Sequence, residues 1–349
     1  MRFILLSILY RFVRYIVTNY LYLFQKIFGI SRNLEPAVRF GDSSLSSIFF
    51  LKRLIYDFEV PKNKSVEIFD LQFSSCIIGS SFKSDPRILD IWMRMGLGGL
   101  IFKTIMEKKR LGNLEPRLQD AKYENMKGLY NSLGLPGMGI KKFLRYLENT
   151  KLWDYNRPLG ISIGGDNEKE YLSNIIYLNN FLKKKERQFF YELNISCPNT
   201  KNGKTISESL TSLEALLRKI RIETVSPISV KISPDTSNEK IQEIAEICEG
   251  LEMIMINAGN TQYKTPEQVG VGVDNFSMKG GGLSGTPLFK RTAEMVTMLN
   301  SFDIPIIATG GISNIHHIEH LKSKGATLFG MASSLVLDPY CIPKIHSKI

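Results

Sequence analysis

The feature that most limits the possible folds of this chain is a regular alternation of short β-like runs with helix-like stretches. Most intervals between the runs have apolar residues at helical spacing, as in SNEKIQEIAEICEG. The β-like runs are residues 74–80, 98–103, 159–164, 191–196, 227–233, 253–257, 304–309 and 326–331. Eight βα units over about 280 residues predict an α/β fold, a (β/α)8 TIM barrel.

Two intervals, 104–158 and 258–303, are too long for ordinary connections and are expected to carry loops over the active face.

A chain of 349 residues with 43% hydrophobic content can bury a large core. Its formal net charge of +11 suits nucleic acid, an anionic membrane or anionic small molecules, and composition does not choose among them. The four cysteines form no CxxC pair, which disfavours disulfides and zinc, and no metal site is expected.

The first thirty residues contain no acidic residue and are dominated by Leu, Ile, Phe and Tyr. On a helix, Ser7, Arg11, Arg14, Thr18 and Gln25 fall within one narrow stripe, and nearly all the remaining surface is apolar. The arginines leave apolar stretches shorter than the ~20 residues of a plain transmembrane span. The pattern predicts a helix lying in a membrane interface, with its arginines reaching lipid phosphates. A spanning helix, a cleaved presequence and a helix packed on the protein's own core are the alternatives.

The sequence predicts three successive parts. Residues 1–30 would be the membrane-associated helix, and residues 31–65 a helical connecting segment with one short helix over 45–58. Residues 66–349 would form the barrel. An N-terminal apolar helical extension would therefore precede the catalytic part of the chain.

Chemistry in such barrels sits at the carboxyl ends of the strands, where this chain places several polar side chains. They are Lys103, Thr104, Asn194, Cys197, Asn199, Lys231 and Asn257. Lys231 lies in an otherwise Ile, Val and Ser strand, so it either reaches solvent or is buried against a negative or electron-rich partner, such as a reduced flavin. Cys197 is either a small buried hydrophobe or a base, whose ordinary pKa of about 8.5 would make the rate climb with pH. No histidine falls at a strand end, which disfavours a histidine-based mechanism.

Glycine clusters follow the last strands: GGGLSG at 280–285, TGGI at 309–312 and then ASS at 332–334. The loops after the seventh and eighth strands are the recurrent phosphate site of this fold, because glycine lets backbone N–H groups approach the ligand. The clusters therefore predict a phosphorylated cofactor. Each glycine taken alone is also explained as a turn residue.

Ordered motifs between about residues 70 and 345 resemble those of the dihydroorotate dehydrogenase family, the FMN barrel enzymes of pyrimidine synthesis. ELNISCPNT, VKISPD, GGLSGTPLF and IPIIATGGI carry the resemblance, and GNLEPRL with NSLGLPGMG resembles the substrate loop. The resemblance implies that dihydroorotate is oxidised to orotate, with Cys197 removing the C5 proton while hydride passes from C6 to the flavin. It makes 66–349 an FMN-binding barrel.

The resemblance also implies two sets of binding residues. Substrate would contact Lys103, Asn131, Leu133, Gly134, Leu135, Asn194, Asn199 and Asn257. FMN would contact Gly79, Ser80, Ser81, Thr104, Asn131, Ser162, Asn194, Lys231, Asn257, Gly282, Ser284, Gly285, Thr309, Gly310, Gly311, Ala332 and Ser333. Lys103 and Lys231 would flank the flavin ring. The phosphate end would be lined by Gly282, Ser284, Gly285, Gly310, Gly311 and Ser333.

The motifs mix two subclasses. VKISPD, GGLSGTPLF and the apolar N-terminus resemble membrane-bound, quinone-reducing class 2 enzymes, whose base is usually serine, whereas Cys197 and the run around Lys103 resemble soluble class 1 enzymes. Ser80 and Ser81 replace the Ala and Gly that the family usually has. Ser84 stands where the family has a lysine, and Lys103 would take the place of that lysine. Further departures are Ala258, Gly259 and Ala332.

The leading interpretation is a membrane-associated, FMN-dependent dihydroorotate dehydrogenase that passes electrons to a quinone through an apolar tunnel formed by the N-terminal helices. Fumarate is the alternative acceptor. The membrane would be the mitochondrial inner membrane in a eukaryote or the cytoplasmic membrane in a bacterium. A dihydrouridine synthase acting on tRNA would suit the basic charge, but Asn199 and Thr200 follow the proline and no RNA-binding domain follows the barrel, so no nucleic-acid partner is expected. A membrane-tethered flavin binder without catalysis is the third interpretation.

Overall fold

Eight parallel strands close into a barrel in chain order, which confirms the predicted TIM barrel. The computed structural model describes residues 2–183, 187–195 and 209–349. The barrel strands are β3 (Ile77–Gly79), β4 (Gly99–Ile105), β7 (Leu159–Ile163), β8 (Phe189–Asn194), β9 (Ile228–Ile232), β10 (Ile254–Ala258), β13 (Ile306–Thr309) and β14 (Leu328–Met331). Each overlaps the run predicted for it.

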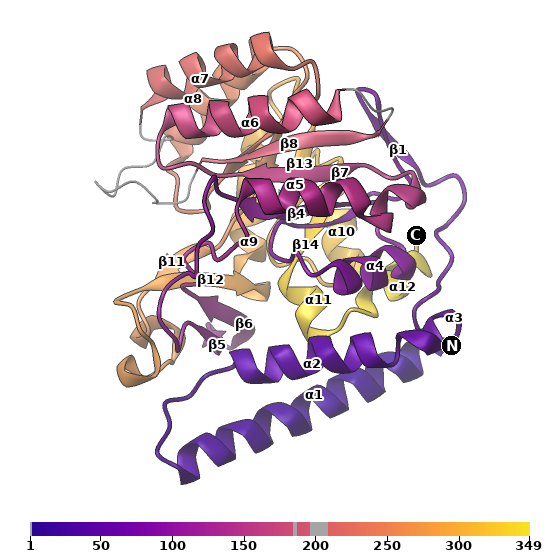
Figure 1. The fold of residues 1–349 in the computed structure, drawn as a ribbon, viewed down its shortest axis with the longest axis vertical. Helices are drawn as coiled ribbons and strands as arrows, with labels where there is room; N and C mark the ends of the chain where they lie inside the picture. The colour runs from indigo at the N-terminus through magenta and orange to yellow at the C-terminus, as the bar shows by residue number, and fades with distance from the viewer. Residues whose placement is uncertain (1, 184–186, 196–208) are drawn as a thin grey trace.

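Helices surround the barrel (Figure 1). They are α4 (Pro86–Met95), α5 (Ile140–Asn149), α6 (Glu168–Leu182), α7 (Leu210–Glu223), α8 (Asn238–Glu249), α9 (Phe289–Leu299), α10 (Ile315–Ser323), α11 (Ser333–Leu337) and α12 (Cys341–His346). The ends of α4 follow from its sequence. The Asp85 carboxylate accepts hydrogen bonds from the backbone N–H groups of Arg87 and Ile88, and Gly96, at φ 115°, ends the helix in the left-handed region.

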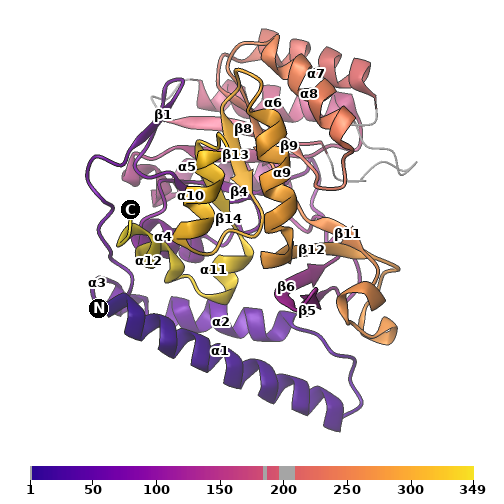
Figure 2. The ribbon, with the colours of Figure 1, turned by 180° about the vertical axis from the view of Figure 1, so that it is seen from behind.

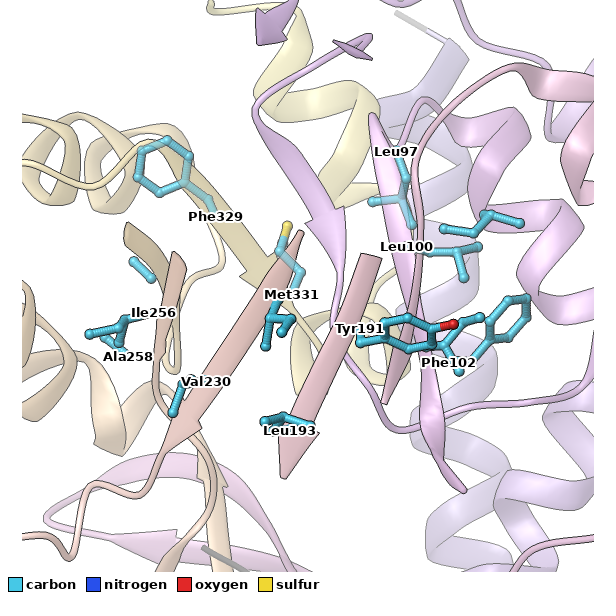
Figure 3. Close-up of a cluster of buried hydrophobic side chains, with 14 of the residues drawn as sticks. Leu97, Leu100, Phe102, Tyr191, Leu193, Val230, Ile256, Ala258, Phe329 and Met331 are labelled. Carbon is cyan, nitrogen blue, oxygen red and sulfur yellow. The ribbon is translucent and has the colours of Figure 1, made fainter. Parts of the chain in front are cut away.

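The outward faces of the strands pack beneath these helices and form the main hydrophobic core. Figure 3 shows part of this layer, in which Tyr191 lies beside Phe102. Phe102 is fully buried, and its ring lies edge-on to Phe143 at 5.3 Å and to Tyr146 at 5.9 Å. Aromatic burial of this kind makes the strand–helix contact a main source of stability.

The inside of the barrel changes character along its axis. At the amino end an apolar layer packs against the hairpin of β1 (Val66–Ile68) and β2 (Leu71–Phe73). This layer contains Ile78, Ile101, Phe190, Met255, Ile307 and Leu328. Side chains alternate along a strand, so the residue two positions further on points the same way. Those residues include Ser80, Lys103, Glu192, Asn257 and Thr309. The carboxyl end of the barrel interior is therefore polar.

The two long intervals contribute a second, antiparallel sheet beyond the barrel (Figure 1). Its strands are β5 (Leu118–Tyr123), β6 (Met126–Asn131), β11 (Gln262–Lys264) and β12 (Gly281–Gly285), in the order β11-β12-β6-β5. The same intervals hold the short 3-10 helices η2 (Lys151–Tyr155), η4 (Glu267–Val269), η5 (Val273–Asn275) and η6 (Thr286–Leu288), and η1 (Phe49–Leu51) lies near the N-terminus. These intervals hold ordered strands, where only loops were predicted.

Two helices at the N-terminus, α1 (Arg2–Ile27) and α2 (Glu35–Ser47), lie along one side of the molecule (Figures 1 and 2). The prediction of a single short helix over 45–58 was wrong. The main helix begins at Glu35, and only η1 and the one-turn α3 (Lys52–Ile55) follow it. Pro36 lies in its first turn, the Asn33 side chain accepts a 3.0 Å hydrogen bond from the Glu35 N–H, and Arg117 donates a 2.7 Å hydrogen bond to the Glu35 carboxylate.

Helix α1 turns its polar stripe toward the protein. Ser7, Thr18 and Gln25 are its buried residues, and Arg14 forms a 2.7 Å ion pair with Asp120. The prediction that Arg14 reaches lipid phosphates was therefore wrong, since a protein carboxylate holds its guanidinium. Arg11 is more exposed, at 58%, and lies 3.9 Å from Asp338.

The apolar residues of α1 consequently point outward. Exposed members are Ile4, Leu5, Ile8, Leu9, Phe12, Val13, Tyr15, Ile16, Tyr20, Leu23, Phe24 and Ile27. By length and composition alone, α1 qualifies as a helix that can cross a membrane, and little of it is buried in the protein. The pattern is the reverse of a soluble surface helix, which hides its apolar face.

Candidate active site

The structure gathers most of the predicted site residues at the carboxyl end of the barrel. They follow or end the barrel strands: Gly79, Ser80, Ser81, Lys103, Thr104, Ser162, Asn194, Lys231, Asn257, Thr309, Gly310, Gly311, Ala332 and Ser333. Parallel strands in a closed barrel point the same way, so their carboxyl ends meet in one place. Cys197 and Asn199 lie outside the residues that the structure describes, and their roles stay predictions.

One hydrogen-bonded chain links three barrel strands and orients an asparagine. The hydroxyls of Thr104 and Ser162 lie 2.9 Å apart, and the Asn194 amide donates to the Thr104 hydroxyl at 3.0 Å. Asn260, which the sequence analysis missed, donates to the Asn194 amide oxygen at 3.3 Å. The amide group of Asn194 is thus fixed from two sides.

A second buried network surrounds Glu192, a side chain with no solvent exposure. The Ser81 hydroxyl donates to one carboxylate oxygen at 2.7 Å, and the Asn257 amide donates to the other at 2.6 Å. Lys231 donates to the Ser81 hydroxyl at 2.9 Å, and its ammonium lies 3.8 Å from Glu192. The negative partner expected for Lys231 therefore exists within the chain itself.

Lys103 is the cation of the site with the least favourable surroundings. Burial, together with the charges of Arg117 and Lys83, lowers its pKa to about 8. Helix α2 supplies the carboxylates of these two neighbours, since Asp42 pairs with Lys83 and Glu35 with Arg117. An anionic ligand beside Lys103 would stabilise its charged form.

The segment predicted as the substrate loop is held by backbone contacts. The Asn131 amide donates to the Gly282 carbonyl at 3.3 Å, across the pairing of β6 with β12. The Leu133 carbonyl accepts from the N–H of Asn113 at 3.0 Å. Gly134 has φ +70°, and a Cβ there would lie 2.7 Å from the Asn113 amide oxygen, so no larger residue fits. Leu135, the third predicted residue of this loop, also has a positive φ, of 49°.

The predicted phosphate end is assembled from segments far apart in the chain. The Ser333 hydroxyl donates to the Ser284 hydroxyl at 2.8 Å. A Cβ on Gly311 would lie 2.5 Å from the backbone nitrogen of Phe289, and one on Gly285 would lie 3.0 Å from the Cα of Gly128. These close approaches require glycine and leave backbone groups accessible for an anion.

Three buried polar atoms at the site have no hydrogen-bond partner among the described residues, which fits a ligand with polar atoms. They are Ser80 Oγ, Asn257 Oδ1 and Thr309 Oγ1. Leaving such atoms unpaired is costly. Their residues lie at the carboxyl ends of β3, β10 and β13, where the ring of FMN would supply hydrogen-bonding nitrogen and oxygen atoms.

Sequence reasoning missed Glu192 and Asn260. A signal for Glu192 was present, because it alternates in phase with Phe190 and Asn194 and so had to point into the barrel. Asn260 had no such signal, since it follows the end of β10 in an irregular segment.

Comparison with known proteins gives consistent matches. The family profile described as "Dihydroorotate dehydrogenase" matches residues 64–349. The chain is 30% identical over 263 residues to a dihydroorotate dehydrogenase B (NAD(+)) catalytic subunit of Staphylococcus carnosus, covering 72% of this chain and 80% of that protein. It is 28% identical over 297 residues to a putative dihydroorotate dehydrogenase A (fumarate) of Aquifex aeolicus, covering 82% and 92%.

A relative with a third acceptor matches as well. A dihydroorotate dehydrogenase (quinone) of Acinetobacter baylyi is 28% identical over 290 residues, covering 78% of this chain and 83% of that protein. A crystal structure of DHODH from Eimeria tenella in complex with ferulenol has a TM-score of 0.70 at 21% identity and covers 88% of this chain and 89% of that chain. The named electron acceptors thus differ among relatives of similar identity.

Proposed function

The chain belongs to the dihydroorotate dehydrogenase family of pyrimidine synthesis, and from this premise we propose that it oxidises dihydroorotate to orotate with FMN and passes the electrons to a quinone at a membrane surface. The proposed oxidation is supported by the polar side chains and glycine loops gathered at the carboxyl end of the barrel. The observation that carries the membrane and the quinone is the uncovered apolar face of α1.

FMN would lie across the barrel mouth, with its ring near Lys231 and its phosphate near the glycine loops. Ser80, Asn257 and Thr309 would give their unpaired atoms to the ring. Ser284 and Ser333, which already contact each other, would meet the phosphate together with the backbone at Gly310 and Gly311. When bound, FMN supplies the acceptor for the hydride that leaves C6 of dihydroorotate.

Cys197 would remove the proton from C5 of dihydroorotate. A thiol has an ordinary pKa of about 8.5, so the fraction of active thiolate grows with pH through the neutral range. Asn194 would hold the pyrimidine, because Thr104 and Asn260 fix its amide before substrate arrives. Such preorganisation lowers the cost of orienting the reacting C–H bonds.

The carboxylate of dihydroorotate would pair with Lys103. No carboxylate is hydrogen-bonded to the Lys103 ammonium among the described residues, and Arg117 and Lys83 lie near enough to lower its pKa. An arriving anion would offset this repulsion. Asn131, Leu133, Gly134 and Leu135 would close over the ligand from the sheet beyond the barrel.

A quinone is the proposed acceptor because α1 presents an apolar face that no other part of the described chain covers. Aliphatic and aromatic side chains pointing outward along a helix of 26 residues suit the acyl region of a membrane, where quinones dissolve. Arg14, Ser7 and Gln25 meanwhile bind the protein side, so α1 would lie on the membrane as part of the folded domain.

The first test is anaerobic mixing of the purified, FMN-loaded protein with dihydroorotate, followed by the visible absorbance of the flavin. We expect bleaching whose rate rises with pH and which is abolished in Cys197→Ala. Reoxidation is then compared with a short-chain quinone, fumarate and NAD+. Bound flavin that dihydroorotate does not bleach would overturn the proposed oxidation, and faster reoxidation by fumarate or NAD+ would overturn the proposed acceptor.

Membrane binding is tested by flotation with vesicles that contain anionic lipid. Phe12→Glu introduces a charge on the outward face of α1, where the side chain is 59% exposed, and we expect it to abolish flotation. Ile222→Glu is the matched control, because Ile222 is 83% exposed on α7, on the opposite side of the molecule (Figure 1). Equal flotation of both variants would contradict the proposal.

A further inference from the structure

Glu192 has no part in the proposed catalytic steps, yet it is the carboxylate most deeply buried at the polar end of the barrel. It has no solvent exposure, and both of its oxygens accept hydrogen bonds. Burying a carboxylate costs more than burying a neutral side chain of the same shape, and an amide would fill this space with less desolvation. Packing alone therefore does not explain why a carboxylate occupies this position.

The contacts tie Glu192 to Lys231 through an intermediary. The Ser81 hydroxyl donates its only proton to Glu192 at 2.7 Å and accepts a hydrogen bond from the Lys231 ammonium at 2.9 Å. The direct distance from the ammonium to the carboxylate is 3.8 Å. Ser81, which follows β3, thus receives one N–H of Lys231 and bridges the ammonium to the carboxylate.

Two further contacts complete the arrangement. Asn257 donates to the second oxygen of Glu192 at 2.6 Å, which turns its own amide oxygen into the site as an unpaired acceptor. Lys231 lies opposite both Asn194 on β8 and Asn257 on β10 in the strand register. Glu192 therefore sets the orientation of two groups that face the proposed flavin ring.

We infer that Glu192 is a positioning residue that acts through Ser81 and Lys231 to lower the reduction potential of the bound flavin. The inference rests on the proposed function, in which Lys231 lies beside the flavin ring. A flavin gains negative charge on reduction, and a neighbouring ammonium stabilises that charge. A fixed carboxylate beside the ammonium offsets part of its field, so reduction is favoured less and transfer of the electrons to the acceptor is favoured more.

The test is the two-electron reduction potential of the bound flavin in the FMN-loaded full chain, measured against reference dyes without substrate. Glu192→Gln keeps the shape and an acceptor for Ser81 but removes the charge. We expect the equilibrium to shift roughly tenfold toward the reduced flavin, a rise of about 30 mV for a two-electron couple. Stopped-flow traces should show faster bleaching by dihydroorotate and slower reoxidation by quinone.

Two comparisons separate charge from packing. Ser229→Ala removes another buried polar group of the barrel interior, directly opposite Glu192 in the strand register, and we expect an unchanged potential. Lys231→Met should lower the potential, because it removes the ammonium that stabilises the reduced flavin. Adding Glu192→Gln to Lys231→Met should raise the potential by less than Glu192→Gln does alone, because the part of the effect that depends on the position of the ammonium is lost.

The outcomes distinguish the inference from the function on which it rests. If the unsubstituted chain binds no FMN, or dihydroorotate does not bleach it, the proposed function fails. If the unsubstituted chain is bleached and Glu192→Gln binds FMN with an unchanged potential, the inference alone is overturned. If Glu192→Gln does not bind FMN, the potential is measured in Glu192→Asp, which moves the carboxylate away from Ser81 by one methylene. A potential of Glu192→Asp that is no higher than that of the unsubstituted chain overturns the inference.

Discussion

The carboxyl end of the barrel and helix α1 both turn polar side chains inward and apolar side chains outward, but only the barrel has its apolar exterior covered. Phe102 points out of β4 and is buried under α5, next to Phe143. Phe12 points out of α1 and is 59% exposed. The same inversion therefore makes a core in one region and an uncovered apolar surface in the other. A further partner is needed only by α1, and a membrane is the partner we propose.

The largest expected effect compares these two phenylalanines directly. Phe102→Ala should lower the free energy of unfolding by about 3–5 kcal/mol, because it removes a buried ring and leaves a cavity. Phe12→Ala should change it by less than about 0.5 kcal/mol in detergent-free buffer, because the ring is already largely exposed. Denaturant unfolding measures both. A similar loss of unfolding free energy in the two variants would mean that protein covers α1 in solution. It would contradict the contrast between a covered barrel and an uncovered α1.

A smaller effect concerns the inward-facing cations. Arg14 on α1 has a carboxylate at 2.7 Å, whereas Lys103 in the barrel lies near Arg117 and Lys83, and its pKa falls from 10.5 to about 8. Between these values the folded protein holds fewer protons than the unfolded chain, so the free energy of unfolding should rise with pH. The destabilisation, roughly 3 kcal/mol, is complete below the folded pKa and lost above the unfolded pKa.

The measurement is denaturant unfolding of the FMN-free protein from neutral pH to pH values above 10. Lys103→Met should remove the rise between the two pKa values, and it should be the more stable protein at neutral pH. Lys142→Met, which alters an exposed lysine on α5, should retain the rise. If the wild-type curve is flat through this range, the interior of the barrel does not disfavour the charge on Lys103.

The smallest effect concerns the docking of α1. The Asp120 carboxylate accepts hydrogen bonds from Arg14 at 2.7 Å and from Tyr22 at 3.1 Å. Asp120→Asn removes the charge, and we expect α1 to lose about 1–2 kcal/mol of protection in hydrogen exchange. The barrel strands should keep theirs.

An exposed pair provides the control for this prediction. Arg218 and Glu214 form an i,i+4 ion pair on α7, with side chains 61% and 41% exposed. Glu214→Gln should change local protection by no more than about 0.5 kcal/mol. If α1 exchanges hydrogen as slowly in Asp120→Asn as in the wild-type protein, the polar face of α1 contributes little to its docking.

The barrel was readable from the sequence because each strand carries its own local signal. Short β-like runs alternating with helix-like stretches predicted all eight strands, and the rule that chemistry lies at their carboxyl ends placed Lys103, Asn194, Lys231 and Asn257 in one site. Both inferences use only chain order and period-2 alternation, which do not depend on distant contacts.

Contacts between distant segments were beyond the reach of that reasoning. Ser81 and Glu192 are 111 positions apart, and no periodicity links a loop after β3 with a residue of β8. In the same way, Glu35 at the start of α2 pairs with Arg117, 82 positions further along the chain. The sequence marked Ser81 as a departure from its family, and only the structure paired it with a buried carboxylate.

The sequence by itself determined the barrel, the location of its site and the stripe of polar residues on an otherwise apolar N-terminal helix. Only the tertiary structure decided which way that helix faces, because a stripe is equally consistent with lipid phosphates and with protein carboxylates. Asp120 and Asp338 lie on the protein where Arg14 and Ser7 meet it, and these contacts turn the apolar face outward. Patterning fixes which residues share a face, and packing against distant partners fixes where that face points.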